Sequence, residues 1–204
     1  MSPYLKDLWI GAVWGGTNLI LLARNNSIFE EQSFSLNQEK RKWHNQLHLP
    51  NHGEIKINTD GAARGNPGKG GIGCIFRESE GKFLGSFAQG LGLVSNNTVE
   101  CKAIIKGVDL AASNGWPIAW VESDSKSAVE AFNSDNIPWN LEAEWANAKR
   151  SMEQIRISAT WRKANFSADV LSKRGAYLLD GLSEFSLSRP EFLKKIEISM
   201  QEYF

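Results

Sequence analysis

From residue 54 to residue 175, the hydrophobic pattern of this chain switches repeatedly between a two-residue period and a helical period. Residues 55–60 alternate apolar and polar side chains, which predicts a half-buried strand. A glycine-rich turn follows, and then two strand-like runs at 72–77 and 82–88 with a turn signal at 79–81 between them. Because strands so close in sequence usually pair with each other, we expect an antiparallel meander of three strands.

Helices and strands alternate after this meander. The periodicity predicts helices at 97–113, 125–133, 140–152 and 165–174, and strands at 118–124 and 155–162. A meander followed by such alternation implies an α/β fold, with a five-stranded mixed sheet and helices packed on it. Asn165 is a candidate N-cap of the helix that it opens. Pro190 is placed to open a further helix up to residue 203.

The length of 204 residues suits one domain of roughly 150 residues together with extra segments. We divide the chain into a tryptophan-rich, partly helical connector at 1–32, a linker at 33–53, the α/β domain at 54–175 and a C-terminal helical extension at 176–204. The second segment is assigned as a linker because its polar run ends in proline and glycine.

Charge and cysteine content exclude some classes of protein. The 23 basic residues balance 23 acidic ones, so the formal net charge is zero. This excludes a nucleic-acid binder whose affinity comes from bulk positive charge, although local basic patches stay compatible with the sequence. Cys74 and Cys101 are too few for a disulfide framework, and no cysteine–histidine cluster has the spacing of a zinc site.

Residues 8–23 carry no charge, which suggests a membrane anchor as one interpretation. A spanning helix needs about twenty apolar residues, and this stretch is shorter and contains glycine, threonine and asparagine. We therefore expect a helix that buries one face against protein. The chain as a whole is expected to be monomeric and intracellular, nuclear or cytoplasmic, with no secretion and no membrane partner. A membrane-anchored or secreted protein of unrelated function remains an alternative.

Four acidic residues stand where predicted strands end or predicted helices begin. These are Asp60, Glu100, Asp124 and Asp169. Such positions converge in a mixed sheet, and four carboxylates brought together repel one another, a repulsion that Mg²⁺ would relieve. Two such ions about 4 Å apart would support in-line phosphoryl displacement. Taken singly, each acid has another interpretation. Asp60 could be a turn residue, and Glu100 a favourable charge at the start of its helix. Asp124, followed by Ser125, could be an N-cap, and Asp169 an exposed helix residue.

Four short motifs carry a resemblance to a known family. TDGAARGNPG at 59–68 resembles the TDGxxxGNPG signature of type 1 ribonuclease H domains, and SNNTVE at 95–100 resembles the family's TNNxxE. ESDS at 122–125 resembles the end of its fourth strand, and RKANFSAD at 162–169 resembles its RExNxxAD element. The resemblance covers about residues 54–175 in family order. It implies the ribonuclease H-like fold, with helices on both faces of the sheet.

The resemblance also implies an activity. Asp60, Glu100, Asp124 and Asp169 would act as catalytic residues that hold two Mg²⁺ ions, with Mn²⁺ as a substitute. Water would attack the RNA strand of an RNA/DNA hybrid and leave a 5′-phosphate and a 3′-hydroxyl. The expected nucleic-acid contacts are Gly61, Gly65, Asn66, Ser95, Asn96, Asn97 and Ser125. The two glycines would let the backbone approach the strand, and the side chains would read its 2′-hydroxyls. Helix-start caps for Asn96 and Asn97, and an ordinary turn for the glycines, remain alternative interpretations.

The N-terminal segment is similar to a lead-in found in the ribonuclease H-like proteins of plant non-LTR retroelements. Trp9 and Trp14, together with the runs at 24–26 and 28–30, carry this similarity. It implies that residues 1–32 form the tail of a connector to a reverse-transcriptase domain, which would then be a partner.

The chain also departs from the family pattern. No histidine lies beyond residue 52, Ala159 stands where a histidine is usual, and Lys163 replaces the usual glutamate. The interval between Asp124 and Asp169 leaves no room for the basic helical handle of some bacterial members. Candidate phosphate contacts in its place are Arg150, Arg156, Arg162, Lys163, Lys173 and Arg174, and a solvated surface is the other interpretation. These departures favour a second hypothesis, a catalytically weak or inactive retroelement-derived nucleic-acid-binding module of the same fold.

Overall fold

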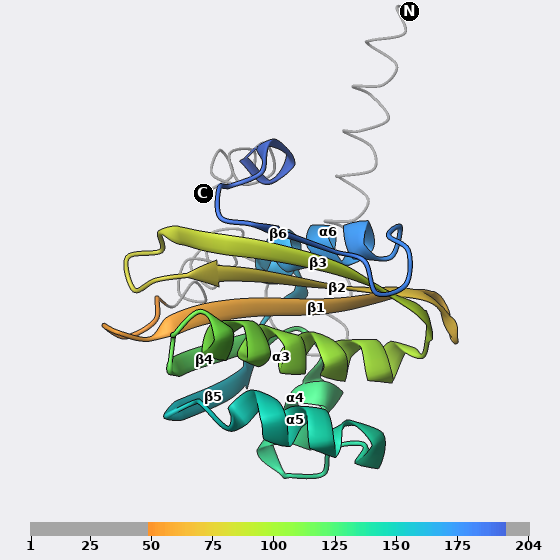
Figure 1. Ribbon diagram of the computed structural model, residues 1–204, viewed down its shortest axis with the longest axis horizontal. Coiled ribbons are helices and arrows are strands. Elements are labelled where there is room, and N and C mark those ends of the chain that lie inside the picture. Colours follow the sequence, from red (N-terminus) through yellow and green to blue (C-terminus); the bar gives the residue numbers. More distant parts are fainter. Residues whose placement is uncertain (1–48, 195–204) are drawn as a thin grey trace, which may run out of the picture. The chain divides into compact units, whose positions relative to one another are not determined.

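The computed structural model describes residues 49–194, which build a mixed sheet with helices on both faces (Figure 1). The strands are β1 (Ile55–Gly65), β2 (Gly68–Arg77), β3 (Phe83–Val94), β4 (Ile118–Ser123), β5 (Gln154–Ala159) and β6 (Ser183–Ser186). Their order is β5-β4-β1-β2-β3-β6. The first three strands form the predicted antiparallel meander, while β4 pairs in parallel with β1 and β5 in parallel with β4.

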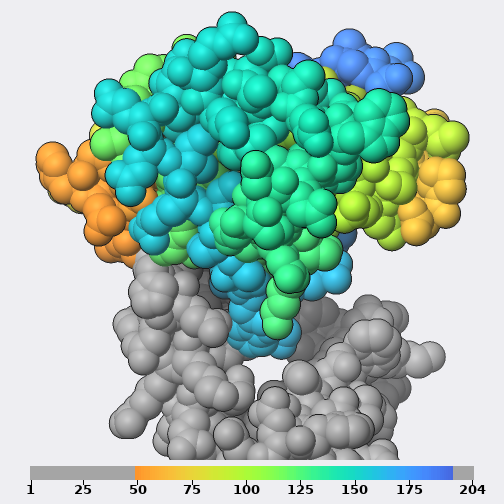
Figure 2. Space-filling model, turned by 90° about the horizontal axis from the view of Figure 1, so that it is seen from below, coloured from red at the N-terminus to blue at the C-terminus, as the bar shows by residue number. Residues whose placement is uncertain are grey.

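Helices cover both faces of this sheet, as predicted. They are α3 (Asn96–Ser113), α4 (Lys126–Asn133), α5 (Glu142–Lys149) and α6 (Phe166–Gly175), with short 3₁₀ turns η1 (Trp139–Leu141) and η2 (Arg162–Asn165). In Figure 1, α3, α4 and α5 lie below the sheet and α6 lies above it. Figure 2 looks from below, and residues of α4 and α5, in green to cyan, cover much of the described part of this face.

The larger core lies between the sheet and α3. Its fully buried side chains include Ile57, Cys74, Phe76, Val99 and Ile104. The strand residues among them share one face of β1 and β2, and the helix residues share one face of α3. The apolar side chains that gave the two periods in the sequence therefore lie in the same core. Cys74 and Cys101 are buried free thiols within it.

The sheet has six strands, whereas the sequence analysis predicted five. The additional strand, β6, lies in the segment 176–204 that was predicted to be helical, and it pairs antiparallel with β3. Helical backbone occurs in the described part of this segment at 191–194. The helical prediction was therefore wrong for β6. Ser183–Ser186 is short and exposed, and its strand conformation comes from hydrogen bonds to the β3 edge rather than from a hydrophobic pattern of its own.

Several predictions concern residues outside the described range. They include the connector at 1–32, the uncharged stretch at 8–23 and all but the last five residues of the linker at 33–53. Within residues 49–194, none of the helices combines the length and the apolar character needed to cross a lipid bilayer.

Glycines in the first hairpin allow α6 to lie directly on the sheet. The predicted glycine-rich turn is largely strand, because β1 and β2 stay paired as far as Gly65 and Gly68. A Cβ atom at Gly71 would overlap the backbone of Ala176, and one at Gly73 would overlap the backbone of Ser172. Only glycine, which has no side chain, lets α6 dock at these two positions. Their close approach brings α6 next to β1, where Asp60 is the cross-strand partner of Gly73.

Candidate active site

Asp60 is held by the contact between β1 and α6. It is 6 % exposed, and its carboxylate accepts a hydrogen bond from the Ser172 hydroxyl through Oδ2. The Ser172 hydroxyl also lies 2.9 Å from the main-chain oxygen of Asp169. Because a serine hydroxyl carries one proton, Ser172 can donate it either to Asp60 or to that carbonyl oxygen. One oxygen of Asp60 is thus in contact with α6.

Glu100 reaches the same place from α3. A Cβ atom at Gly61 would lie 2.6 Å from the Glu100 main-chain nitrogen, so the helix and β1 pack backbone to backbone there. The Gly61 N–H donates a 3.1 Å hydrogen bond to Oε2 of Glu100. A glycine in β1 therefore sets the position of Glu100, just as glycines in β2 set the position of α6.

Asp124 follows β4, the parallel neighbour of β1, so its carboxylate emerges at the same edge of the sheet as Asp60. The Asn165 side-chain amide fixes it from the other side. Its Nδ2 donates to Oδ1 of Asp124 at 3.3 Å and to the main-chain oxygen of Thr59 at 2.9 Å. Asn165 occupies the N-cap position of α6, as predicted, but its side chain is buried in this bridge and makes no cap hydrogen bond.

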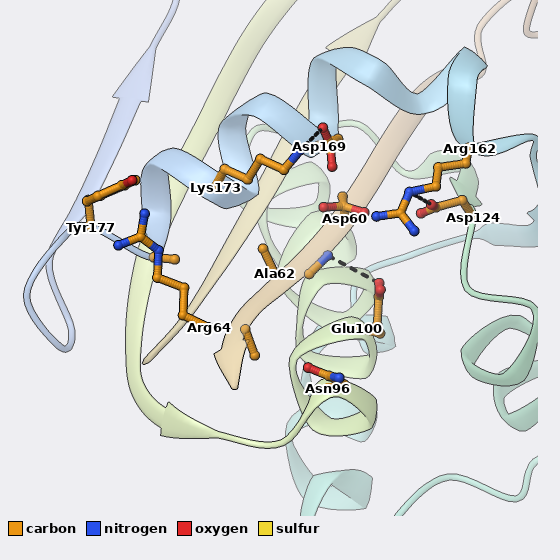
Figure 3. A pocket seen from close by; sticks show the side chains of 13 residues that line it. Asp60, Ala62, Arg64, Asn96, Glu100, Asp124, Arg162, Asp169, Lys173 and Tyr177 are labelled. Carbon is orange, nitrogen blue, oxygen red and sulfur yellow. Dashed lines mark hydrogen bonds and ion pairs between the residues drawn. The ribbon is translucent and has the colours of Figure 1, made fainter. Parts of the chain in front are cut away.

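The carboxylates of Asp60, Glu100 and Asp124 form one group, with ligand oxygens all within 4.8 Å of one another (Figure 3). Burial, followed by the charge of Glu100, raises the pKa of Asp60 to about 8. Burial, followed by the charge of Asp124, raises the pKa of Glu100 to about 7. Negative charge is thus unfavourable here without a cation, and three hard oxygen donors are the ligand set that Mg²⁺ prefers.

Asp169 lies on α6 and lines the same pocket, but it stands outside the three-carboxylate group. Its Oδ2 accepts from Lys173 Nζ at 2.6 Å, one helical turn away. Arg162 approaches Asp124 in a similar way, with 3.8 Å between Nε and Oδ2. The structure therefore brings three of the four predicted acids into contact distance and places the fourth beside them, paired with a lysine.

The acids line an open pocket of about 690 Å³. Of the predicted nucleic-acid contacts, Gly61 and Asn96 line it, and Oδ1 of Asn66 accepts from the Asn96 N–H at 3.2 Å. Gly65 has a φ of 106°, a conformation that favours glycine, in the turn between β1 and β2.

The predicted contacts at helix starts have other partners. Ser95 caps α3 and Ser125 caps α4, through hydrogen bonds from Thr98 N and Ala128 N. The alternative interpretation of Asn96 and Asn97 as N-caps is therefore wrong. Asn97 is exposed in the first turn of α3.

Of the six basic residues proposed for phosphate contacts, Arg162 and Lys173 line the pocket. Arg156 and Arg174 instead form ion pairs with glutamates outside it, Glu54 and Glu184. The sequence analysis missed the contact of Ser172 with Asp60 altogether. Its position three residues after Asp169, on the same face of a predicted helix, is the signal from which it could have been inferred.

Comparison with known proteins finds relatives over the part of the chain that carries this site. Residues 58–175 match the model of the Reverse transcriptase-like family. A protein of Arabidopsis thaliana named as a ribonuclease H protein is 30% identical in an alignment of 147 positions, which covers 66% of this chain and 22% of that protein. The chain thus spans about a fifth of the length of this plant relative. The ribonuclease H of Syntrophomonas wolfei is 31% identical over 112 residues, 53% of this chain and 71% of that protein.

Solved structures are similar over the same region. The N-terminal ribonuclease H domain of a Mycobacterium tuberculosis protein has a TM-score of 0.56 and 28% identity, covering 60% of this chain and 98% of that one. LC11-RNase H1, in complex with an RNA/DNA hybrid, has a TM-score of 0.53 and 26% identity, covering 60% of this chain and 96% of that one.

Proposed function

Because this chain belongs to the Reverse transcriptase-like family of ribonuclease H-like proteins, we propose that it hydrolyses the RNA strand of RNA/DNA hybrids in a Mg²⁺-dependent reaction. The observation that carries this proposal is the group of Asp60, Glu100 and Asp124, whose oxygens lie within 4.8 Å of one another in an open pocket. Its donors are all carboxylates, which suits a hard divalent cation and a phosphodiester substrate.

These three residues, with Asp169, would hold two Mg²⁺ ions, with Mn²⁺ as a substitute. When bound, the ions supply an activated water on one side of the phosphate and stabilise the leaving oxygen on the other. The chain's own residues prepare the ligands for this task. Ser172 engages one oxygen of Asp60, Gly61 N–H orients Glu100, and Asn165 orients Asp124.

Basic side chains compensate the negative charge of the substrate. Lys173 and Arg162 already lie against Asp169 and Asp124, so they stand where a phosphate and a cation would share the pocket. An incoming cation competes with these two side chains for the carboxylates, and each is then free to contact phosphate oxygens.

Selectivity for a hybrid is proposed to come from the rim of the pocket. RNA is distinguished from DNA by its 2′-hydroxyls, which short polar side chains can recognise in the minor groove. Asn66 and Asn96 are joined by a hydrogen bond at this rim, and Asn97 is exposed beside them. We extend this role to Gly61 and Gly65 as points of close backbone approach, and to Ser95 and Ser125 at the two helix starts.

A second candidate is a catalytically weak or inactive module that binds nucleic acid through the same pocket. It is favoured by Ala159 at the end of β5, a position where the family resemblance implies a histidine. The ion pair between Lys173 and Asp169 favours it too, because the fourth carboxylate is then less available to a cation.

Cleavage of end-labelled RNA/DNA hybrid, with Mg²⁺ or with chelator, separates the candidates. RNA/RNA and DNA/DNA duplexes serve as substrate controls. We expect Mg²⁺-dependent cutting of the RNA strand of the hybrid alone, loss of cutting in Asp60→Asn, and retained cutting in Asp109→Asn. Asp109 is the matched control because it is an acid on α3 that pairs with Lys106 outside the pocket. Full activity in Asp60→Asn would contradict the proposal, and hybrid binding without cutting would establish the second candidate.

We further propose that residues 1–32 connect this domain to a reverse-transcriptase domain of a retroelement-derived protein, inside the nucleus or cytoplasm. The family match and the N-terminal motif support this. The domain itself is proposed to be a monomer, which light scattering after size-exclusion chromatography tests. A stable dimer would contradict that part.

A further inference from the structure

The pocket continues past the acidic group along β1. Asp60, Ala62 and Arg64 lie on the same face of the strand, because alternate residues share a face. A strand rises about 3.3 Å per residue, which places Arg64 roughly 13 Å from Asp60 along β1. Alanines line the pocket between them, and their small side chains keep this part open (Figure 3).

At the far end of this extension, Arg64 stacks on Tyr177. The guanidinium carbon lies 3.5 Å from the centre of the ring. Stacking uses the face of the guanidinium group, so its in-plane N–H donors stay available to a ligand. Tyr177 itself is 72 % exposed. Figure 3 shows the pair on the opposite side of the pocket from Arg162 and Asp124.

The backbone that carries the ring is held in place by the fold. Tyr177 N donates to the main-chain oxygen of Arg174 at 3.1 Å, which closes the turn after α6. The preceding residue, Ala176, rests on the sheet at Gly71, where no Cβ atom could fit. The main chain at the aromatic partner of Arg64 is therefore positioned by the same close packing that positions Asp169.

Charge distinguishes Arg64 from the other cations of the pocket. Arg162 and Lys173 each face an aspartate, whereas no carboxylate within residues 49–194 forms an ion pair with Arg64. An exposed guanidinium with available donors, held by a ring at the end of a groove, suits a bidentate contact with a phosphate.

We propose that Arg64 and Tyr177 form a phosphate-binding subsite for the strand whose scissile bond lies at the acidic group, an inference that rests on the proposed function. A nucleic-acid strand rises about 3.4 Å per nucleotide along its axis, so the subsite holds a phosphate up to roughly four nucleotides from the scissile one. The stack orients the guanidinium before the strand arrives, which reduces the entropy lost on binding. Arg64 acts in binding only, because it is too far from the acids to touch the reacting atoms.

The test measures binding separately from cleavage. The dissociation constant of the full chain for a labelled RNA/DNA hybrid is measured by fluorescence anisotropy at several salt concentrations. Ca²⁺ replaces Mg²⁺ to neutralise the carboxylates, and gels verify that the hybrid stays intact. Arg64→Ala should weaken binding about 5- to 10-fold at low salt and reduce the slope of log affinity against log salt by about 1. With Mg²⁺, KM should rise and kcat should stay unchanged.

Variants of Tyr177 and a surface lysine provide the controls. Tyr177→Ala removes the stack and should weaken binding in the same direction as Arg64→Ala, whereas Tyr177→Phe keeps the ring and should bind as the unaltered chain does. Lys82→Ala removes an exposed cation at the distant β2–β3 turn and should have no effect.

The outcomes separate the subsite from the enzyme. An unchanged affinity and salt slope in Arg64→Ala, or a fall in kcat without a change in binding, would overturn the subsite while leaving the proposed function intact. If the unaltered chain binds hybrid without cutting it, the proposed hydrolysis fails, and the effect of Arg64→Ala on binding still decides the subsite. Absence of hybrid binding by the folded, unaltered chain would overturn both.

Discussion

Replacing Asp60 by asparagine should stabilise the metal-free protein while abolishing hydrolysis. Asparagine has nearly the same shape as aspartate, and its carbonyl oxygen can still accept the hydrogen bond from Ser172. The substitution removes the negative charge of a residue that is only 6 % exposed and lies beside Glu100 and Asp124. Fold and packing are kept, and only the cost of burying this carboxylate is lost.

The magnitude follows from the pKa of Asp60, which is raised from 3.8 to about 8. The folded protein therefore binds the Asp60 proton more tightly than the unfolded chain does, so stability falls as the pH rises from 4 to 8. At about 1.4 kcal/mol per pH unit, the shift sets an upper limit of roughly 6 kcal/mol. The neighbouring carboxylates share this cost, so we expect Asp60→Asn to gain about 2–4 kcal/mol at pH 8, or a Tm higher by about 4–15 °C.

Thermal unfolding followed by circular dichroism, in chelator, checks this expectation. The difference in Tm between Asp60→Asn and the unaltered chain should be large at pH 8 and close to zero at about pH 3, where Asp60 is mostly protonated in both the folded and the unfolded state. Asp109→Asn, a change at a half-buried acid outside the pocket, should show no such pH-dependent gain. An equal or lower Tm for a folded Asp60→Asn protein at pH 8 would refute the reasoning about the buried charge.

Three further perturbations test the site. Mg²⁺ affinity should rise between pH 6 and pH 8, because Asp60 and Glu100 have raised pKa values and must lose their protons before they bind a cation. Calorimetry in two buffers should detect the released protons, and binding without proton release would contradict this. Ser172→Ala should weaken Mg²⁺ binding about 10- to 100-fold, which corresponds to one lost hydrogen bond to a charged group. An unchanged calorimetric isotherm would contradict that positioning role. Gly73→Ala should cost about 3 kcal/mol in urea unfolding, because the new methyl group overlaps the backbone of α6; wild-type stability would show that α6 docks differently.

The fold could be predicted from the sequence wherever a segment buries one face. Residues 55–60 and 97–113 have clear periods of two and 3.6, and both form the predicted element in the larger core. β6 could not be predicted in this way, because Ser183–Ser186 buries little and becomes a strand only through the edge of β3. The extension of β1 to Gly65 was missed for a related reason. Glycines normally indicate a turn, but here they accommodate helices that pack directly on the sheet.

The acidic site could be predicted in outline. Asp60, Glu100 and Asp124 were expected together and lie together. The prediction that Asp60 ends the first strand was wrong, because β1 continues to Gly65. The pairing of Asp169 with Lys173 depends on side-chain geometry within one helix, which a sequence motif does not specify. The contact of Ser172 with Asp60 depends on how closely two elements more than a hundred residues apart approach each other, and that distance is set by glycines elsewhere.

Direct docking of α6 on glycines gives the site two parts that can come apart. α6 and the turn after it carry the fourth carboxylate, on Asp169, and the aromatic partner of Arg64. The other three acids lie on α3, on β1 and directly after β4. A sub-global opening that lifts α6 would dismantle half of the site while the sheet stays folded. Hydrogen exchange of the α6 amides therefore reports the fraction of molecules in which α6 is docked and the site is complete. The melting temperature of the whole domain does not give this fraction.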